Sequence, residues 1–191
     1  MCGRYFIDDG YDPEISGIIG QINDIYCGTP ELSQMRTGEI FPTDIAPVIT
    51  ARSPALMKWG FSRWDGKGRI INARLETAGE RPMFRQHFIS RRCLIPASRY
   101  FEWRRDQGKK QKYAIGQKGA IYMAGLYAFE EGSRLPLFVI LTRPADICVS
   151  FIHDRMPVIV GRDMMRPWIE GEAGAGDILG SPAAELIISE A

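Results

Sequence analysis

Seven short segments rich in valine, isoleucine, tyrosine and phenylalanine fill most of the chain between residues 46 and 143. Glycine, proline and charged residues separate them, as turns separate β-strands. Because these segments outnumber the helical ones and do not alternate regularly with them, we expect an α+β fold on a mostly antiparallel sheet, barrel-like or as two packed sheets. The segments are 46–50, 54–59, 68–74, 92–103, 112–117, 120–129 and 135–143, with hairpin connections at 106–111 and 116–120.

A few peripheral helices are expected around this sheet. The candidate segments are 12–22, 78–89, 144–152 and 162–170, and Asp163 is the candidate N-cap of the last one. The 191 residues suit one domain with a substantial core, and no repeat or low-complexity linker divides them. We therefore predict a single domain over residues 1–191 that ends in an acidic tail at about residues 171–191.

The composition argues against several classes of protein. We expect no membrane span, because no apolar stretch is long enough, and no signal peptide, because no basic-then-apolar segment opens the chain. The four cysteines form no CxxC pair and the two histidines lie at no ligand spacing from them, so we expect reduced thiols and no metal site. A cytoplasmic monomer without a cofactor is the resulting expectation.

Charge is segregated along the chain although the net charge is only +1. Residues 81–112 contain ten basic and two acidic residues, whereas residues 170–191 contain five acidic residues and no basic one. This separation is typical of a face that binds a polyanion beside a solvated acidic segment. A merely soluble surface also accounts for it.

The first residues suggest covalent chemistry. Removal of Met1 would make Cys2 the first residue, with an amine that is partly unprotonated at neutral pH. Such an amine attacks an aldehyde to give an imine, and the adjacent thiolate can then close a five-membered thiazolidine ring at a high effective concentration. Cys2 is therefore a candidate nucleophile, and the alternative is a buried or idle cysteine.

Three further polar residues lie in segments that suit a reactive site. Asn72 can orient a reacting group through its amide. The alternative is a polar strand face, shared by Asn72, Arg74 and Glu76, that only carries an ion pair between Arg74 and Glu76. Glu102 stands between two aromatic residues and is a candidate proton shuttle, or a salt-bridge partner of a nearby arginine. His153 precedes a charged pair and a Met-Pro step, and it is either a proton carrier or a structural histidine.

Two residues are candidates for contact with a nucleic acid. Arg4 lies two residues from Cys2, where it can guide a phosphate to the thiol. Trp64 is one of three aromatic residues within 59–64, and an exposed tryptophan beside arginines suits base stacking. We expect at most one of these three aromatic residues to stack, because most tryptophans are core residues.

Four groups of motifs, spread in order from residue 1 to about residue 168, resemble the SOS response-associated peptidase (SRAP) family. They are MCGRY at 1–5, WGF before INARLET at 59–77, RRCLIPASRYFEW at 91–103, and LTRPAD followed by HDRMPVI at 141–159. The resemblance implies a sensor and shield for abasic sites in single-stranded DNA. It also implies loss of Met1 and a covalent thiazolidine between Cys2 and the ring-opened sugar, with weak lyase activity and self-reversal as side reactions.

The resemblance also implies roles for particular residues. Cys2, Asn72, Glu102 and His153 are the expected catalytic residues: Glu102 moves the protons that open the sugar, His153 assists proton transfer there or in reversal, and Asn72 holds the amine or a sugar oxygen. No metal or nucleotide is required. The partner is single-stranded DNA with an abasic site, so the bound protein would lie at the nucleoid. The expected DNA-contact residues are Arg4, Pro42, Trp64, Arg74, Arg85 and Thr142.

Two alternatives stay open from the sequence. An N-terminal-nucleophile amidohydrolase or peptidase would also use a terminal cysteine with its own amine as base. A plain single-strand-binding module would leave Cys2 incidental. The three functions predict a covalent adduct, amide hydrolysis and reversible binding, respectively.

Overall fold

The computed structural model describes residues 2–10, 12–106, 108–180 and 185–191. Its main sheet closes into a barrel of five strands. The first and last of five consecutively paired strands also pair with each other, which makes a closed circuit. Within this circuit the β10–β4 pairing is parallel and the other pairings are antiparallel. The expected α+β, mostly antiparallel, barrel-like fold is therefore confirmed. The circuit runs through β8 (Arg92–Asp106), β9 (Lys109–Ala128), β10 (Leu137–Pro144), β4 (Pro54–Trp59) and β3 (Ile45–Ile49).

Short strands extend this barrel at its edges. β1 (Tyr5–Ile7) pairs with β8, and β2 (Gly38–Ile40) pairs with β1. β7 (Asn72–Arg74) and β11 (Arg155–Pro157) both pair with β10, and β12 (Ile187–Glu190) pairs with β9. β5 (Phe61–Ser62) and β6 (Arg69–Ile70) form a separate two-stranded sheet. The sequence pattern missed β1, β2, β11 and β12, because three or four residues are too short for an alternation to be visible.

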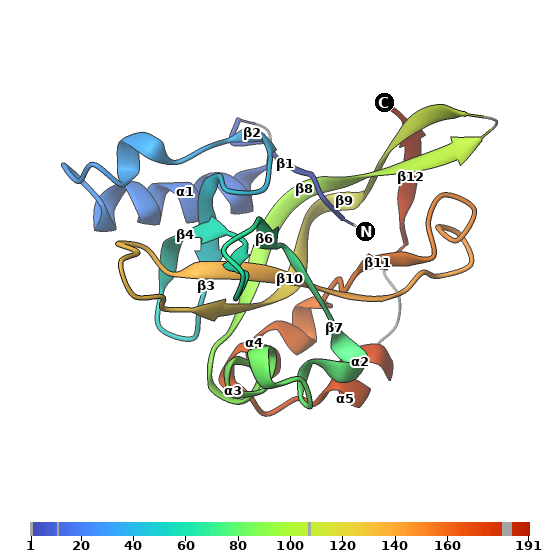
Figure 1. Ribbon diagram of the computed structural model, residues 1–191. Coiled ribbons are helices and arrows are strands. Elements are labelled where there is room, and N and C mark those ends of the chain that lie inside the picture. The colour runs from blue at the N-terminus through green and yellow to red at the C-terminus, as the bar shows by residue number, and fades with distance from the viewer. Residues whose placement is uncertain (1, 11, 107, 181–184) are drawn as a thin grey trace.

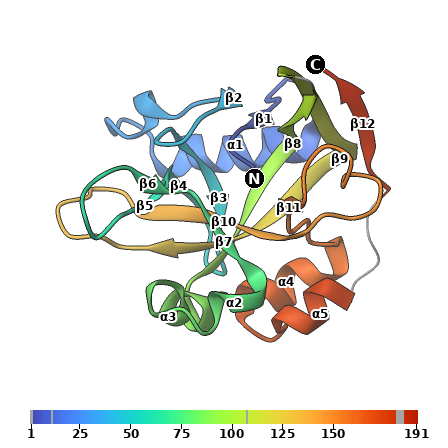
Figure 2. The ribbon, with the colours of Figure 1, turned by 45° about the vertical axis from the view of Figure 1, so that its right-hand side comes forward.

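The helices lie on two sides of the barrel. α1 (Pro13–Ile25) lies along one side, and α2 (Leu75–Ala78), α3 (Pro82–Ser90), α4 (Arg162–Glu170) and α5 (Ala175–Gly180) gather on the other (Figures 1 and 2). A single 3₁₀ turn, η1 (Leu32–Gln34), follows α1. Thus the described part of the acidic C-terminal segment folds against the domain, with Ile178 buried and β12 in the sheet.

The sequence of α1 explains its position. The Asp12 carboxylate accepts hydrogen bonds from the backbone N–H groups of Glu14 and Ile15, and Pro13 occupies the first turn. Ile15, Ile18 and Ile22 follow at a spacing of three and four residues and are buried, so one face of the helix packs on the barrel.

Three local predictions were wrong. Residues 144–152 form turns after β10 and no helix. The N-cap of α4 is Gly161, which leaves Asp163 inside the first turn. Residues 116–120 do not turn the chain back: β8 advances by two residues between Ala97 and Arg99, while β9 advances by five between Gly116 and Ile121, so the extra residues bulge out of a continuous strand.

Trp59 links the core to the strand that carries Asn72. Its ring stacks on Phe138 at 6.1 Å and meets the edge of Tyr5 at 5.2 Å. Its indole N–H donates to the carbonyl of Ile71 (3.0 Å), the residue before β7. The core therefore fixes where β7 begins. Among the described residues, no helix is both long and apolar enough to cross a membrane.

Candidate functional site

The N-terminal segment reaches the centre of the molecule because β1 is anchored on β8 (Figure 1). Tyr5 pairs with Tyr100, and the N–H of Phe101 donates to the carbonyl of Arg4 (2.9 Å). This register brings Cys2 to the part of β8 that contains Glu102. The thiol of Cys2 is buried and lies 3.8 Å from the carbonyl oxygen of Arg4, to which it donates.

Asn72 contacts Cys2 directly. Its Nδ2 donates to the carbonyl of Cys2 (2.8 Å), 70 residues away in the chain. β7 runs parallel to β10, so Asn72 lies beside Ile140 in a fixed register. Because the amide nitrogen of Asn72 makes this bond, the other amide atom is the oxygen Oδ1. It is buried and forms no hydrogen bond within the described part of the chain. A buried acceptor without a partner beside Cys2 is a place where a donor would be bound.

The protein alters the acidity of the Cys2 thiol. Burial raises its pKa far above the usual value, and the nearby carboxylate of Glu102 raises it further. The thiol is therefore neutral at pH 7, without even the small thiolate fraction that a free cysteine has at this pH. A reaction at this sulfur needs a base, and Glu102, only 2% exposed, is the acidic side chain that acts electrostatically on the thiol.

Two tyrosines complete the buried surroundings of Cys2. Burial raises the pKa of Tyr5 and of Tyr100, and Cys2 raises both further. Neither hydroxyl forms a hydrogen bond with any described residue. These two groups were missed by the sequence analysis, because nothing in an alternating strand shows which hydroxyls will face the same buried centre.

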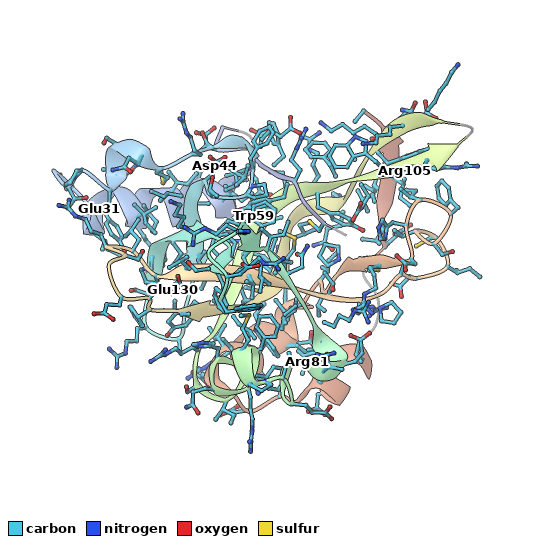
Figure 3. All side chains as sticks on the ribbon, viewed as in Figure 1. Glu31, Asp44, Trp59, Arg81, Arg105 and Glu130 are labelled. Atoms are coloured by element: carbon cyan, nitrogen blue, oxygen red, sulfur yellow. The ribbon has the colours of Figure 1, made fainter. Side chains whose placement is uncertain are left out.

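A cavity of about 490 Å³ brings Glu102 and His153 together. Arg105 and Lys110, a cross-strand pair of the β8–β9 hairpin, line it as well. The hairpin extends away from the barrel, and Arg105 lies on it (Figure 3). The acid and the histidine thus face the same space as two cations.

A second cavity, of about 530 Å³, lies beside Asn72. Arg74 and Thr142, two of the expected DNA-contact residues, line it, and so does Arg81, which the sequence analysis did not select. Arg85 lies exposed on α3 and is absent from the lining of both cavities. Arg81 and Arg105 lie far apart in Figure 3, so the cavity lined by Asn72 and the cavity lined by Glu102 lie at different parts of the surface.

Arg4 is held by its own protein. Its Nη1 pairs with Glu39 (3.1 Å), and its guanidinium lies 4.3 Å from the ring centre of Phe41 and 5.0 Å from that of Trp103. Lys112 shares the same oxygen of Glu39 (2.9 Å). The pKa of Glu39 is lowered: its burial opposes this, but the hydrogen bonds from Lys112 and Arg4 prevail. Arg4 therefore belongs to a cationic and aromatic cluster that includes Trp103, a lining residue of the cavity that holds Glu102 and His153.

Two further DNA-contact candidates lie at the surface. Trp64 is 89% exposed, whereas Trp59 and Phe61 are buried, so one of the three aromatic residues is free to stack. Pro42 occupies the second position of a tight turn in which the N–H of Asp44 donates to the carbonyl of Phe41 (3.0 Å). No cluster of three histidine, cysteine or carboxylate side chains in the described ranges could hold a metal ion.

The ion pair between Arg74 and Glu76, which the sequence left open as an alternative, is not formed. Glu76 instead pairs with Arg155, at 2.6 and 2.9 Å, while Arg74 is exposed at the edge of its cavity. Arg155 comes two residues after His153. The residues of the NAR motif and of the HDRMP motif are therefore joined in space.

Fold and site together define a small barrel domain with a buried cysteine at residue 2. Asn72, which lines one cationic cavity, donates a hydrogen bond to this cysteine, and Glu102, which lines the other, raises the pKa of its thiol. The chain belongs to the family described as SOS response associated peptidase (SRAP), whose model matches residues 1–185. It is 31% identical to abasic site processing protein YoaM of Bacillus subtilis over 95% of this chain and 84% of that one.

Two other comparisons agree with this assignment. The chain is 35% identical to abasic site processing protein YedK of Escherichia coli, over 69% of this chain and 59% of that protein. A crystal structure of a protein from Bacteroides thetaiotaomicron superimposes with a TM-score of 0.81 at 21% identity, covering 99% of this chain and 91% of the other. That structural likeness supports the fold alone.

Proposed function

We propose that this protein processes abasic sites in single-stranded DNA by forming a covalent thiazolidine between Cys2 and the opened sugar. The observation that carries the proposal is the contact between Asn72 and Cys2, with the second amide atom of Asn72 buried and unbonded within the described residues. Relatives named abasic site processing proteins support the substrate. The proposed partner is the lesion-containing strand, and no metal enters the chemistry.

The first step requires a free amine. Loss of Met1 converts the nitrogen of Cys2 from an amide into an amine, and Oδ1 of Asn72 is placed to accept a hydrogen bond from a group near it. The amine adds to the C1′ aldehyde of the sugar, and loss of one water gives the imine. Glu102 transfers the protons that open the sugar and release this water.

The second step closes the ring. The Cys2 sulfur adds to the imine carbon, and its proton passes to the nitrogen, so no oxidant or reductant is needed. Because burial keeps the thiol neutral, Glu102 accepts the thiol proton and delivers it to the ring nitrogen. His153, across the same cavity, assists these transfers or those of the reverse hydrolysis. β-Elimination from the imine before ring closure would give a weak lyase side reaction.

The cavities suit a nucleic-acid strand. Arg105 and Lys110 line the cavity of Glu102, and Arg74 and Arg81 line the cavity of Asn72, so a phosphate chain would meet cations near both residues that neighbour Cys2. An abasic nucleotide has no base to unstack, which lowers the cost of drawing it inward.

The decisive experiment incubates the protein with a single-stranded oligonucleotide that carries one abasic site. We expect a heat-stable adduct on a denaturing gel, abolished in Cys2→Ala and retained in Cys148→Ala, which removes an exposed cysteine. Intact mass of the active protein is expected to lack Met1. Hydrolysis of a peptide or glutamine substrate without adduct would favour the amidohydrolase, and salt-sensitive reversible binding alone would favour a binding module.

A further inference from the structure

A two-pronged ion pair joins α2 to β11. Arg155 Nη1 donates to Glu76 Oε1 (2.6 Å), and Nη2 donates to Glu76 Oε2 (2.9 Å). The side chain of Arg155 is only 12% exposed, against 33% for Glu76. The hydrogen bond from Arg155 is the main reason why the pKa of Glu76 lies below its usual value. This geometry orients the guanidinium more strictly than a single contact would.

The same guanidinium is fixed on its other side. Nη2 of Arg155 also donates to the carbonyl of Thr142 (2.7 Å) and to its Oγ1 (3.2 Å). Thr142 is fully buried, and its hydroxyl donates to the carbonyl of Ala73 (3.3 Å) in β7. The network therefore joins β7, β10, β11 and α2, and it holds Arg155 at a fixed place.

The backbone of Arg155 acts on His153. Its N–H donates to His153 Nδ1 (3.0 Å). A backbone amide can only donate, so Nδ1 carries no proton in this contact, and the proton of the neutral ring lies on Nε2. Asp154 Oδ1 lies 2.7 Å from the same Nδ1, and a carboxylate can only accept, so that contact requires a proton on Nδ1. The two contacts exclude each other.

We propose that Glu76 is a positioning residue for His153. The side chain of Asp154 is 85% exposed and can turn into water. The backbone of Arg155 is instead fixed by the pairing of β11 with β10, and its guanidinium is held by Thr142 and by Glu76. Glu76 therefore completes the restraints on the residue whose N–H donates to His153. Glu76 thereby keeps His153 in the Nε2–H form, with a proton to donate and an unprotonated Nδ1. The consequence for the reaction rests on the proposed function, but the state of the ring does not.

The ring state can be measured without DNA. The chain has only two histidines, so long-range ¹H–¹⁵N correlation spectra resolve His153, with His87 as internal reference. At about pH 8, where imidazole is normally neutral, we expect Nδ1 of His153 to show the shift of an unprotonated nitrogen in the wild type. In Glu76→Gln we expect a mixture of the two tautomers, with His87 unchanged.

Two variants control this measurement. Glu80→Gln removes the same charge four residues further on, at an exposed residue without an ion pair in the described structure, and the wild-type spectrum is expected. Asp154→Asn alters an exposed side chain and is also expected to keep the Nε2–H form. A tautomer that changes in Asp154→Asn, or one that stays unchanged in a folded Glu76→Gln, overturns the proposal.

The kinetic test separates this proposal from the proposed function. At saturating lesion DNA, we expect Glu76→Gln to slow formation or reversal of the adduct by about tenfold. This is a part of the rate acceleration that an acid–base residue supplies. The affinity for DNA is expected to stay unchanged. If Glu76→Gln and the wild type form the adduct at the same rate and also reverse it at the same rate, the inference is overturned. A wild-type protein that forms no adduct would reject the proposed function instead, and the spectra would still decide the role of Glu76.

Discussion

Glu102 is the proposed proton carrier for the buried thiol of Cys2, whose pKa is raised first by burial and then by Glu102 itself. We predict that Glu102→Gln slows adduct formation by about a hundredfold, the lower range for losing a general acid–base group. Affinity for the same DNA is expected to stay within about twofold, since the residue is buried and binds no phosphate. Quenched time courses on denaturing gels measure the rate. Glu131→Gln, an exposed site in the β9–β10 turn, is the control, and an unchanged rate in Glu102→Gln would exclude the role.

Thr43 shows strain at a single residue. It has φ of +80° in the turn that presents Pro42, and among the described residues it is the only non-glycine with positive φ. A β-branched residue at the third position of a type II turn is strained by about 1–3 kcal/mol. We predict that Thr43→Gly raises the free energy of unfolding by about 1 kcal/mol, because glycine adopts this conformation freely but has a more flexible unfolded chain.

Urea denaturation followed by circular dichroism measures this difference. Thr37→Gly provides the comparison, because Thr37 has no positive φ and the substitution should lower stability there. A loss of stability in Thr43→Gly would show that the turn is not strained.

At the scale of the elements, the β8–β9 hairpin places like charges opposite each other. Arg105 faces Lys110 across the two strands, an arrangement that destabilises a hairpin unless an anion lies between them. We predict that the double variant Arg105→Gln/Lys110→Gln binds single-stranded DNA more weakly. The slope of log affinity against log salt should fall by about 1.4, for two phosphate contacts to a single strand.

The same strand offers a matched control. Lys118 is exposed on β9 but lies outside the cavity that Glu102 and His153 line, so Lys118→Gln should keep the wild-type slope. Fluorescence anisotropy at several salt concentrations gives both slopes. Equal slopes in the wild type and the double variant would remove the hairpin from the DNA path.

The secondary-structure predictions succeeded where a signal was local. β4 and α4 lie at residues 54–59 and 162–170 as expected, and α1 forms where the N-cap Asp12 and the periodic isoleucines coincide. The helix predicted at residues 144–152 was wrong, because the apolar spacing there imitates a helix. In the structure Ile147 is 93% exposed and the segment forms turns after β10. The bulge at 117–120 was missed because glycines in a strand pattern indicate a turn and a bulge equally.

At the scale of the whole molecule, carboxylates connect distant segments. Glu14 of α1 accepts a hydrogen bond from Tyr122 of β9 (2.6 Å) and pairs with Arg162 of α4, while Glu76 pairs with Arg155. The pKa values of Glu14 and Glu76 are lowered mainly by hydrogen bonds from Arg162 and Arg155, respectively. A carboxylate with a lowered folded pKa stabilises the fold above its unfolded pKa, and this contribution is lost as the pH falls through the folded pKa.

We therefore predict that the protein loses stability as the pH falls below about 4.3, the ordinary value for glutamate. Glu76→Gln should cost about 1 kcal/mol at pH 7, a small value because the carboxylate is partly exposed and screened. The difference from the wild type should shrink as the pH falls through the lowered folded pKa of Glu76, because the wild-type carboxylate is then protonated as well. Urea titrations across this range test the sign, and a difference independent of pH would show that charge is not the cause.

The sequence by itself determined the kinds of structure and chemistry available. Alternating apolar residues and turn residues are local signals, so they predicted a mostly antiparallel barrel-like sheet, and the motifs singled out Cys2, Asn72, Glu102 and His153 before any contact was known. Only the tertiary structure decided what lies together. Strand register and barrel closure bring Asn72 to Cys2 across 70 residues. They also place Arg81 rather than Arg85 at a cavity, and they pair Glu76 with Arg155. Contacts of this kind depend on how distant segments pack, which no local pattern records.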